Sequence, residues 1–134
     1  MRRKQKKTIP LQNRSDILPL LKDIATERQE HFVVLSLNSE RCLIRKRVVF
    51  IGTVNAVIAH PREIFAGAIE DRACSIIVAH NHPSGDPTPS GQDIAATEQL
   101  MKAGEILGIE LVEHLIVAND RWFSFGESNK AMVC

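Results

Sequence analysis

Two histidines and an aspartate stand at a spacing that suits a metal ion: His80 and His82 are two residues apart, and Asp93 follows eleven residues later. Residues i and i+2 of an extended strand point to the same side, so the two imidazoles can converge on one point. Zinc takes nitrogen ligands at about 2.0–2.1 Å and also accepts carboxylate oxygen. Two imidazoles and one carboxylate leave a fourth position open, as in catalytic zinc sites. We therefore predict one zinc ion per chain, held by His80, His82 and Asp93.

Two further residues are candidates for catalysis at such a site. Glu30 stands at the edge of an apolar segment, and its carboxylate could take a proton from a zinc-activated water and pass it to a leaving amine. Glu27, nearby in the sequence, is the alternative base. Ser90 could donate a hydrogen bond to the oxyanion that forms on the attacked carbonyl.

The same residues also have a structural reading. Ser90 and Asp93 match the S-x-x-D variant of a capping box, which begins a helix. The aspartate can in principle serve a metal while the serine also caps. Paired histidines on a strand often lie at its end without a metal, and Glu30 alone is an ordinary charged residue. The full combination is what favours a site, because its spacing is expected by chance in on the order of one in a few thousand chains of this length.

Hydrophobic periodicity and turn residues indicate the elements that would position these side chains. The sequence predicts helices at 15–28, 61–72 and 92–107, and strands at 31–38, 42–51, 75–80, 109–118 and 121–125. Ser15 or Asp16 is the expected N-cap of the first helix, while Ser90 and Gly108 are expected to begin and end the third. The first two strands, joined by a predicted turn at 38–41, are expected to pair as a hairpin. This order predicts a mixed α/β (α+β) sheet flanked by helices.

Length and composition set the class of protein. The 134 residues suit one domain, and 44% hydrophobic with 25% charged residues is an ordinary soluble balance. No apolar run approaches the roughly 20 residues of a membrane span, and no signal peptide is visible. The three cysteines form no CxxC pair, which suits a reducing compartment. We expect a cytoplasmic protein without membrane contact, in which Cys42 and Cys74 are small core residues.

Basic residues gather at the N-terminus, where residues 1–7 hold five of the 17 lysines and arginines. The remainder carries 12 basic and 16 acidic residues, a net charge of −4. Such a run is typical of a solvated end. We expect residues 1–12 to form a basic flexible tail and residues 13–134 the folded domain. The acidic remainder argues against nucleic acid as a partner, except through this tail.

We expect structural roles for the other three histidines. His31 lies on the strand face opposite Glu30, and His60 precedes Pro61 in a predicted turn. His114 is expected to be buried with an internal hydrogen bond; the alternative is a place behind the metal ligands. A zinc deaminase would need H-x-E followed by P-C-x-x-C, and a zincin would need H-E-x-x-H; the sequence contains neither pattern.

The stretch AHNHPSGDPTPSGQD, residues 79–93, resembles the JAMM (MPN+) metal motif in the form carried by the bacterial RadC family. Four further segments are similar to RadC-family segments in order and spacing. They are EHFVVLSLN at 30–38, GTVNAVIAHPREIF at 52–65, LGIELVEHLIV at 107–117 and RWFSF at 121–125. The resemblance covers roughly residues 15–126, and the stretch at 79–93 is its most specific part.

The resemblance implies a JAB/MPN fold, a mixed sheet flanked by helices and related to the cytidine deaminase architecture. It implies zinc at His80, His82 and Asp93, with Glu30 as general base and Ser90 stabilising the transition state. Members of the superfamily cleave isopeptide bonds of ubiquitin-like modifiers or process sulfur-carrier proteins. The expected activity is therefore a zinc-dependent metallohydrolase that cleaves a peptide or isopeptide amide bond in a peptide or protein substrate.

Two other functions remain open at the level of sequence. The RadC name, given for DNA repair, and the basic tail suggest a DNA-associated accessory module. Many RadC-like chains carry a helix-hairpin-helix region ahead of this domain, and here we expect it to be absent or to have been cut away. A non-catalytic MPN interaction scaffold is the second alternative. One departure from the family pattern is Glu113-His114, where RadC-like chains usually have Asp-His. We expect it to leave the metal ligands unchanged. The sequence does not indicate the oligomeric state.

Overall fold

The computed structural model describes residues 9–52 and 60–128. Most of the basic tail therefore lies outside the described residues, as do residues 53–59 of the RadC-like segment at 52–65. Within the described ranges, no helix is long and apolar enough to cross a lipid bilayer.

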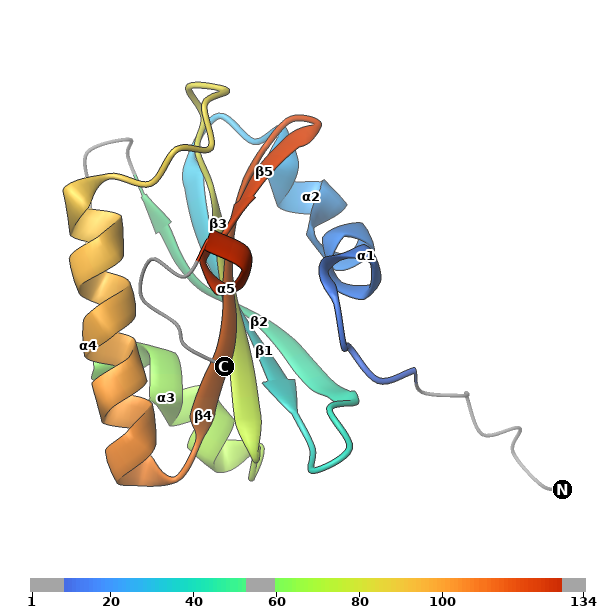
Figure 1. Cartoon of the computed structure of the whole chain (residues 1–134), viewed down its shortest axis with the longest axis vertical. Coiled ribbons are helices and arrows are strands. Elements are labelled where there is room, and N and C mark those ends of the chain that lie inside the picture. The colour runs from blue at the N-terminus through green and yellow to red at the C-terminus, as the bar shows by residue number, and fades with distance from the viewer. Residues whose placement is uncertain (1–8, 53–59, 129–134) are drawn as a thin grey trace, which may run out of the picture.

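A five-stranded mixed sheet runs through the domain (Figure 1). Its strands are β1 (Glu30–Leu37), β2 (Leu43–Gly52), β3 (Ser75–Asn81), β4 (Glu110–Ala118) and β5 (Arg121–Ser124). The order across the sheet is β2-β1-β3-β4-β5, with β3 and β4 parallel and every other pair antiparallel. All seven residues of β3 are buried, as expected for the predicted apolar strand covered on both faces.

Helices cover both faces of this sheet. They are α1 (Arg14–Ile17), the 3-10 turn η1 (Leu18–Leu21), α2 (Lys22–Ala25), α3 (Pro61–Glu70), α4 (Gly91–Leu107) and α5 (Phe125–Ser128). Figure 1 shows α3 and α4 on one side of the sheet and α1 and α2 on the other. Helix α4 makes the crossover that two parallel strands require, here β3 and β4. The predicted mixed α/β architecture is confirmed.

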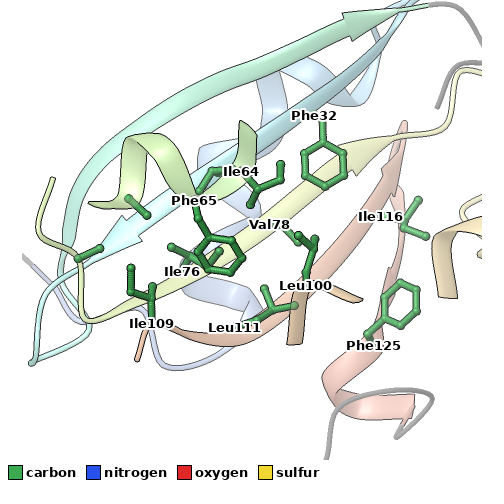
Figure 2. Packing of buried hydrophobic residues seen from close by; sticks show 13 residues of the cluster. Phe32, Ile64, Phe65, Ile76, Val78, Leu100, Ile109, Leu111, Ile116 and Phe125 are labelled. Carbon is green, nitrogen blue, oxygen red and sulfur yellow. The ribbon is translucent and has the colours of Figure 1, made fainter. Parts of the chain in front are cut away.

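Each face of the sheet has its own hydrophobic cluster. Under α3 and α4, side chains from helices and strands point into one space, as Figure 2 shows for Phe65, Val78 and Leu100. Under α1 and α2, Leu21, Ile24 and neighbouring strand residues form the second cluster. The alternation of side chains along each strand therefore divides the apolar residues between two cores.

The first predicted helix differs in detail from the observed one. It is broken into three short pieces, and Pro19, which cannot donate a backbone hydrogen bond, lies within the 3-10 turn. Its N-cap is Asn13 rather than Ser15 or Asp16. Asp16 occupies position N3, and its side chain completes the capping box. Helix α4 begins and ends as predicted, at Ser90 and at Gly108 with its positive φ of 71°.

Contacts with the folded domain begin before residue 13, the first residue that the sequence assigns to it. Leu11 is buried in the second cluster, and its amide donates to the carbonyl of Arg41 at 2.9 Å. Pro10 forms an isolated bridge with Cys42. Pro10 and Leu11, which lie within the range predicted to be a flexible tail, thus contact the folded domain. Cys42 is buried as expected, but Cys74 is exposed, because it lies in the turn between α3 and β3.

A partly buried ion pair between Arg47 and Asp71 connects β2 to the end of α3. The side chain of Asp71, only 5% exposed, accepts hydrogen bonds from Arg47 at 2.7 and 3.1 Å and from Ser36 at 3.0 Å. Gly67 leaves room for the guanidinium stem, because a Cβ there would lie 2.4 Å from Cδ of Arg47. The hydrogen bonds from Arg47 and Ser36 outweigh desolvation and lower the pKa of Asp71 from its ordinary 3.8.

We predict that Asp71→Asn melts several degrees below wild type at pH 7, because the Arg47 side chain loses its carboxylate partner. The folded-state pKa is depressed, so this contribution is present above pH 3.8 and is lost as the pH falls through the lower folded value. Thermal melts of both proteins at several pH values measure the difference. Glu70→Gln is the control, since its exposed carboxylate lies 3.6 Å from Arg47 and should contribute little. Equal losses in both variants, or a pH-independent difference, would contradict the assignment.

Candidate metal site

Strand β3 delivers the two histidines. His80 is the penultimate residue of β3 and is 1% exposed; it stands opposite Phe32 of β1 and Ile116 of β4. His82 follows the strand directly, and its amide still donates to the carbonyl of Val117 at 2.9 Å. The backbone therefore stays extended past the end of β3. The two imidazoles point to one side, with Nε2 atoms 3.2 Å apart.

Asp93 reaches the histidines from the first turn of α4. Its carboxylate lies 3.3 Å from Nε2 of His80 and 3.1 Å from Nε2 of His82. The same carboxylate accepts the backbone N–H of Ser90 at 2.9 Å, and the Asp93 amide donates to Oγ of Ser90 at 3.0 Å. The capping reading of S-x-x-D is confirmed, and the capping box of α4 and the approach to the histidines use the same side chain.

Glu30 enters the site because β1 runs antiparallel to β3. Phe32 pairs with His80, so Glu30, two residues earlier on the same face, lies beyond the end of β3. Its Oε1 is 3.8 Å from Nε2 of His80. Asn81 holds the backbone that leads into β1. Its side chain accepts from the amide of His31 at 2.6 Å and donates to the carbonyls of Glu27 and Gln29. Sequence reasoning missed the role of Asn81.

The structure thus brings together Glu30, His80, His82 and Asp93, each with one ligand atom within 4.8 Å of the others. Two ligands at about 2.0–2.1 Å from a tetrahedral metal are about 3.3 Å apart. The contacts among His80, His82 and Asp93 measure 3.1–3.3 Å, close to that spacing, with Oδ1 of Asp93 facing His80 and Oδ2 facing His82. The residues present therefore fit a metal ion. Glu27, the alternative base, is exposed and is not part of the group.

Hydrogen bonds at Nδ1 of His80 and His82 determine whether the Nε2 atoms, which face the cluster, carry a proton. Nδ1 of His82 lies 2.9 Å from the carbonyl oxygen of Asp86, which can only accept, so Nδ1 carries the proton of the neutral ring. Its Nε2 then presents a lone pair. Nδ1 of His80 lies 2.8 Å from Nε2 of His114, whose Nδ1 in turn lies 2.6 Å from Oγ1 of Thr97. His114 is buried with internal hydrogen bonds, as predicted, and also stands behind a candidate ligand.

Burial and the neighbouring charges shift the pKa values in different directions. Burial raises the pKa of Glu30 above its ordinary value. Burial would also raise the pKa of Asp93, but the contacts with His80 and His82 outweigh it and hold this pKa far below its ordinary range. Burial lowers the pKa of His114 well below its ordinary value, which keeps this ring neutral. The site therefore combines an ionised carboxylate with a neighbouring carboxylate of higher proton affinity.

The fold and these four side chains define the class of protein: a mixed α/β domain with a candidate metal site at the end of its central strand. A family model described as a RadC-like JAB domain matches residues 11–131, and the chain belongs to this family. The match confirms the predicted RadC resemblance and the JAB/MPN fold.

Two relatives show how far the similarity extends. A UPF0758 protein of Geobacillus thermodenitrificans is 48% identical over 108 residues, which are 81% of this chain and 48% of the relative. A UPF0758 protein of Staphylococcus aureus is 45% identical over 131 residues, which are 95% of this chain and 56% of the relative. The chain thus spans about half the length of the curated relatives that it matches.

We predict that the wild-type protein, purified without chelator, carries about one zinc ion per chain and that His82→Ala carries none, because the cluster loses one of its two imidazoles. Elemental mass spectrometry measures the metal content. His31→Ala is a matched control: His31 is half-buried and close in sequence to Glu30, but its ring contacts the carbonyl of Gln29 instead of the cluster. Stoichiometric zinc in His82→Ala, or none in the wild type after zinc is added, would contradict the site.

Proposed function

We propose that this domain is a zinc-dependent hydrolase of a peptide or isopeptide amide bond. The observation that carries the proposal is the convergence of two imidazoles and one carboxylate at contacts of 3.1–3.3 Å, with a second, more distant carboxylate beside them. His80, His82 and Asp93 would hold the ion, and two nitrogens with one oxygen are a donor set that suits zinc. When bound, zinc supplies a Lewis acid that polarises a carbonyl and lowers the pKa of a water molecule to about 7.

Glu30 is the proposed general base. Its carboxylate is 3.8 Å from Nε2 of His80, farther than the 3.1–3.3 Å contacts among the other three residues, so it stands beside the ligand set. Burial raises the pKa of Glu30 and so increases its affinity for a proton. A base of this kind can take a proton from the attacking water and deliver it to the departing amine.

Ser90 is the proposed hydrogen-bond donor to the developing oxyanion. Its Oγ accepts the N–H of Asp93, a contact that uses an oxygen lone pair and leaves the hydroxyl proton for another acceptor. The side chain is exposed at the N-terminus of α4, where a negative charge also gains from the helix dipole. The cap therefore orients the hydroxyl without consuming its donor capacity.

A DNA-associated role is the second candidate. The basic run that suggested it lies at residues 1–7, outside the described residues. The family name alone says nothing of the chemistry at the site. Steeply salt-dependent DNA binding that survived deletion of residues 1–7 would revive this candidate.

The activity test uses the zinc-loaded protein and a panel of peptides and isopeptide-linked peptides. We predict that Glu30→Gln keeps its zinc but loses about 10²–10⁴-fold in rate, because the amide cannot accept the proton. Glu27→Gln is the matched control and should retain wild-type activity, since that carboxylate is exposed outside the cluster. Full activity in Glu30→Gln would remove Glu30 as the base, and a panel that shows no zinc-dependent cleavage would contradict the proposed function.

Ser90→Ala should lower the rate by about 10²–10³-fold through loss of one oxyanion donor. It should also destabilise the protein by about 1 kcal/mol through loss of the cap. Steady-state kinetics and denaturant unfolding separate the two effects. Ser90→Thr keeps both the hydroxyl and the cap and serves as control. A Ser90→Ala variant that is less stable but equally fast would leave the serine with its structural role alone.

A further inference from the structure

A buried chain of hydrogen bonds runs from the metal site into the core behind it. Nδ1 of His80 lies 2.8 Å from Nε2 of His114, and Nδ1 of His114 lies 2.6 Å from Oγ1 of Thr97. The threonine hydroxyl is 2.8 Å from the backbone carbonyl of Asp93, one turn earlier in α4. All three side chains are at most 1% exposed, so water cannot readily replace a lost partner.

The direction of donation along these hydrogen bonds follows from the last acceptor, the backbone carbonyl of Asp93. A carbonyl oxygen can only accept, so the hydroxyl proton of Thr97 goes to Asp93, since two oxygens 2.8 Å apart without a proton would repel. Thr97 must then accept the proton of Nδ1 of His114. Nε2 of a neutral His114 carries no proton and accepts from Nδ1 of His80.

This direction of donation determines the tautomer of His80, at the other end of the hydrogen-bond chain. A neutral His80 whose proton is on Nδ1 has a lone pair on Nε2, the atom that faces His82 and Asp93. If the chain ran the other way, Nε2 of His80 would carry a hydrogen at the position where the ion would bind. Packing holds both rings in place, because the Phe32 ring stacks on His80 at 5.5 Å and the Phe125 ring on His114 at 4.6 Å.

The chain also joins two candidate ligands that come from different elements. Asp93 and Thr97 lie in α4, while His80 and His114 lie on β3 and β4. The route from the Asp93 carbonyl through Thr97 and His114 therefore returns to the ring that faces the Asp93 carboxylate. The hydrogen bonds of this chain connect α4 to β4 and β3, and a cation would be needed to join the Asp93 carboxylate to the facing lone pair of His80.

We propose that Thr97 and His114 are positioning residues, which fix the tautomer of His80 and its place relative to Asp93 and so prepare the metal site. This inference rests on the proposed metal site but does not depend on which bond is cleaved. Residues that hydrogen-bond to a metal-ligating histidine typically contribute 10–100-fold to metal affinity.

The test compares two nearly isosteric changes at Thr97. Thr97→Val removes the acceptor for Nδ1–H of His114. The His114 ring can then carry its proton on Nε2 and donate it to Nδ1 of His80, which moves the proton of His80 to Nε2, the nitrogen that faces the metal site. We expect zinc affinity, measured by competition with a chromogenic chelator, to fall about 10–100-fold. Thr97→Ser keeps the hydroxyl and should bind zinc within a few-fold of wild type. His114→Phe keeps a ring against Phe125 but removes the acceptor, and should weaken zinc at least as strongly as Thr97→Val.

Two measurements without substrate separate positioning from general stability. Melting of the metal-free variants reports the fold, and the visible spectrum of the cobalt-loaded proteins reports ligand geometry. Nitrogen-15 shifts of the histidine rings report the tautomer of His80, which we expect to carry its proton on Nδ1 in wild type and Thr97→Ser and to change in Thr97→Val.

Wild-type zinc affinity and an unchanged tautomer in Thr97→Val and His114→Phe would overturn the inference, as would equal losses in Thr97→Ser and Thr97→Val. A wild-type protein that binds no metal would overturn this inference and the proposed function together. If every protein binds zinc as expected but none cleaves the substrate panel, the proposed function fails while the positioning role stands.

Discussion

Strand β3 lies in the middle of the sheet, and its pairing with β1 on one side and β4 on the other decides where each site residue stands. Antiparallel pairing places the start of β1, and therefore Glu30, beside the end of β3, where the histidines are. Parallel pairing places His114 of β4 on the same face as His80. The crossover through α4 that this parallel pair requires returns Asp93 to the same edge. A single sheet topology thus assembles the candidate site, and His114 behind it, from β1, β3, β4 and α4.

The same arrangement has an energetic cost that the surrounding contacts reduce. Polar groups that are removed from water are unfavourable unless they are hydrogen-bonded, and His80, Asn81, Thr97 and His114 are all buried. Each has protein partners, and among the described residues no buried side-chain nitrogen or oxygen is left without one. The inner face of the cluster is different, because acceptor atoms converge there at 3.1–3.3 Å. A cation is the natural partner for such a group, since it interacts favourably with every member at once.

The start of α4 shows how one pair of side chains serves both fold and site. Ser90 and Asp93 satisfy the first backbone N–H groups of the helix, which would otherwise lack partners. The cap also fixes the carboxylate toward His80 and His82 and leaves the serine proton free of that contact. A structural and a functional reading of S-x-x-D are therefore compatible, because the cap and the contacts with the histidines use the same pair of residues.

The sequence by itself determined the α/β class, the order of the main elements, the borders of α4 and the RadC family, because hydrophobic periodicity, capping residues and motif spacing are local properties. It also singled out Glu30, His80, His82, Ser90 and Asp93, since their types and order match one known motif. Tertiary structure decided what depends on contacts between distant segments. Asn81 anchors the approach to β1, Thr97 meets His114 only because α4 packs on β4, and Leu11 joins the core through contacts with a distant turn. Such pairings leave no periodic trace in the sequence, because the partners are brought together only when the sheet and its covering helices have formed.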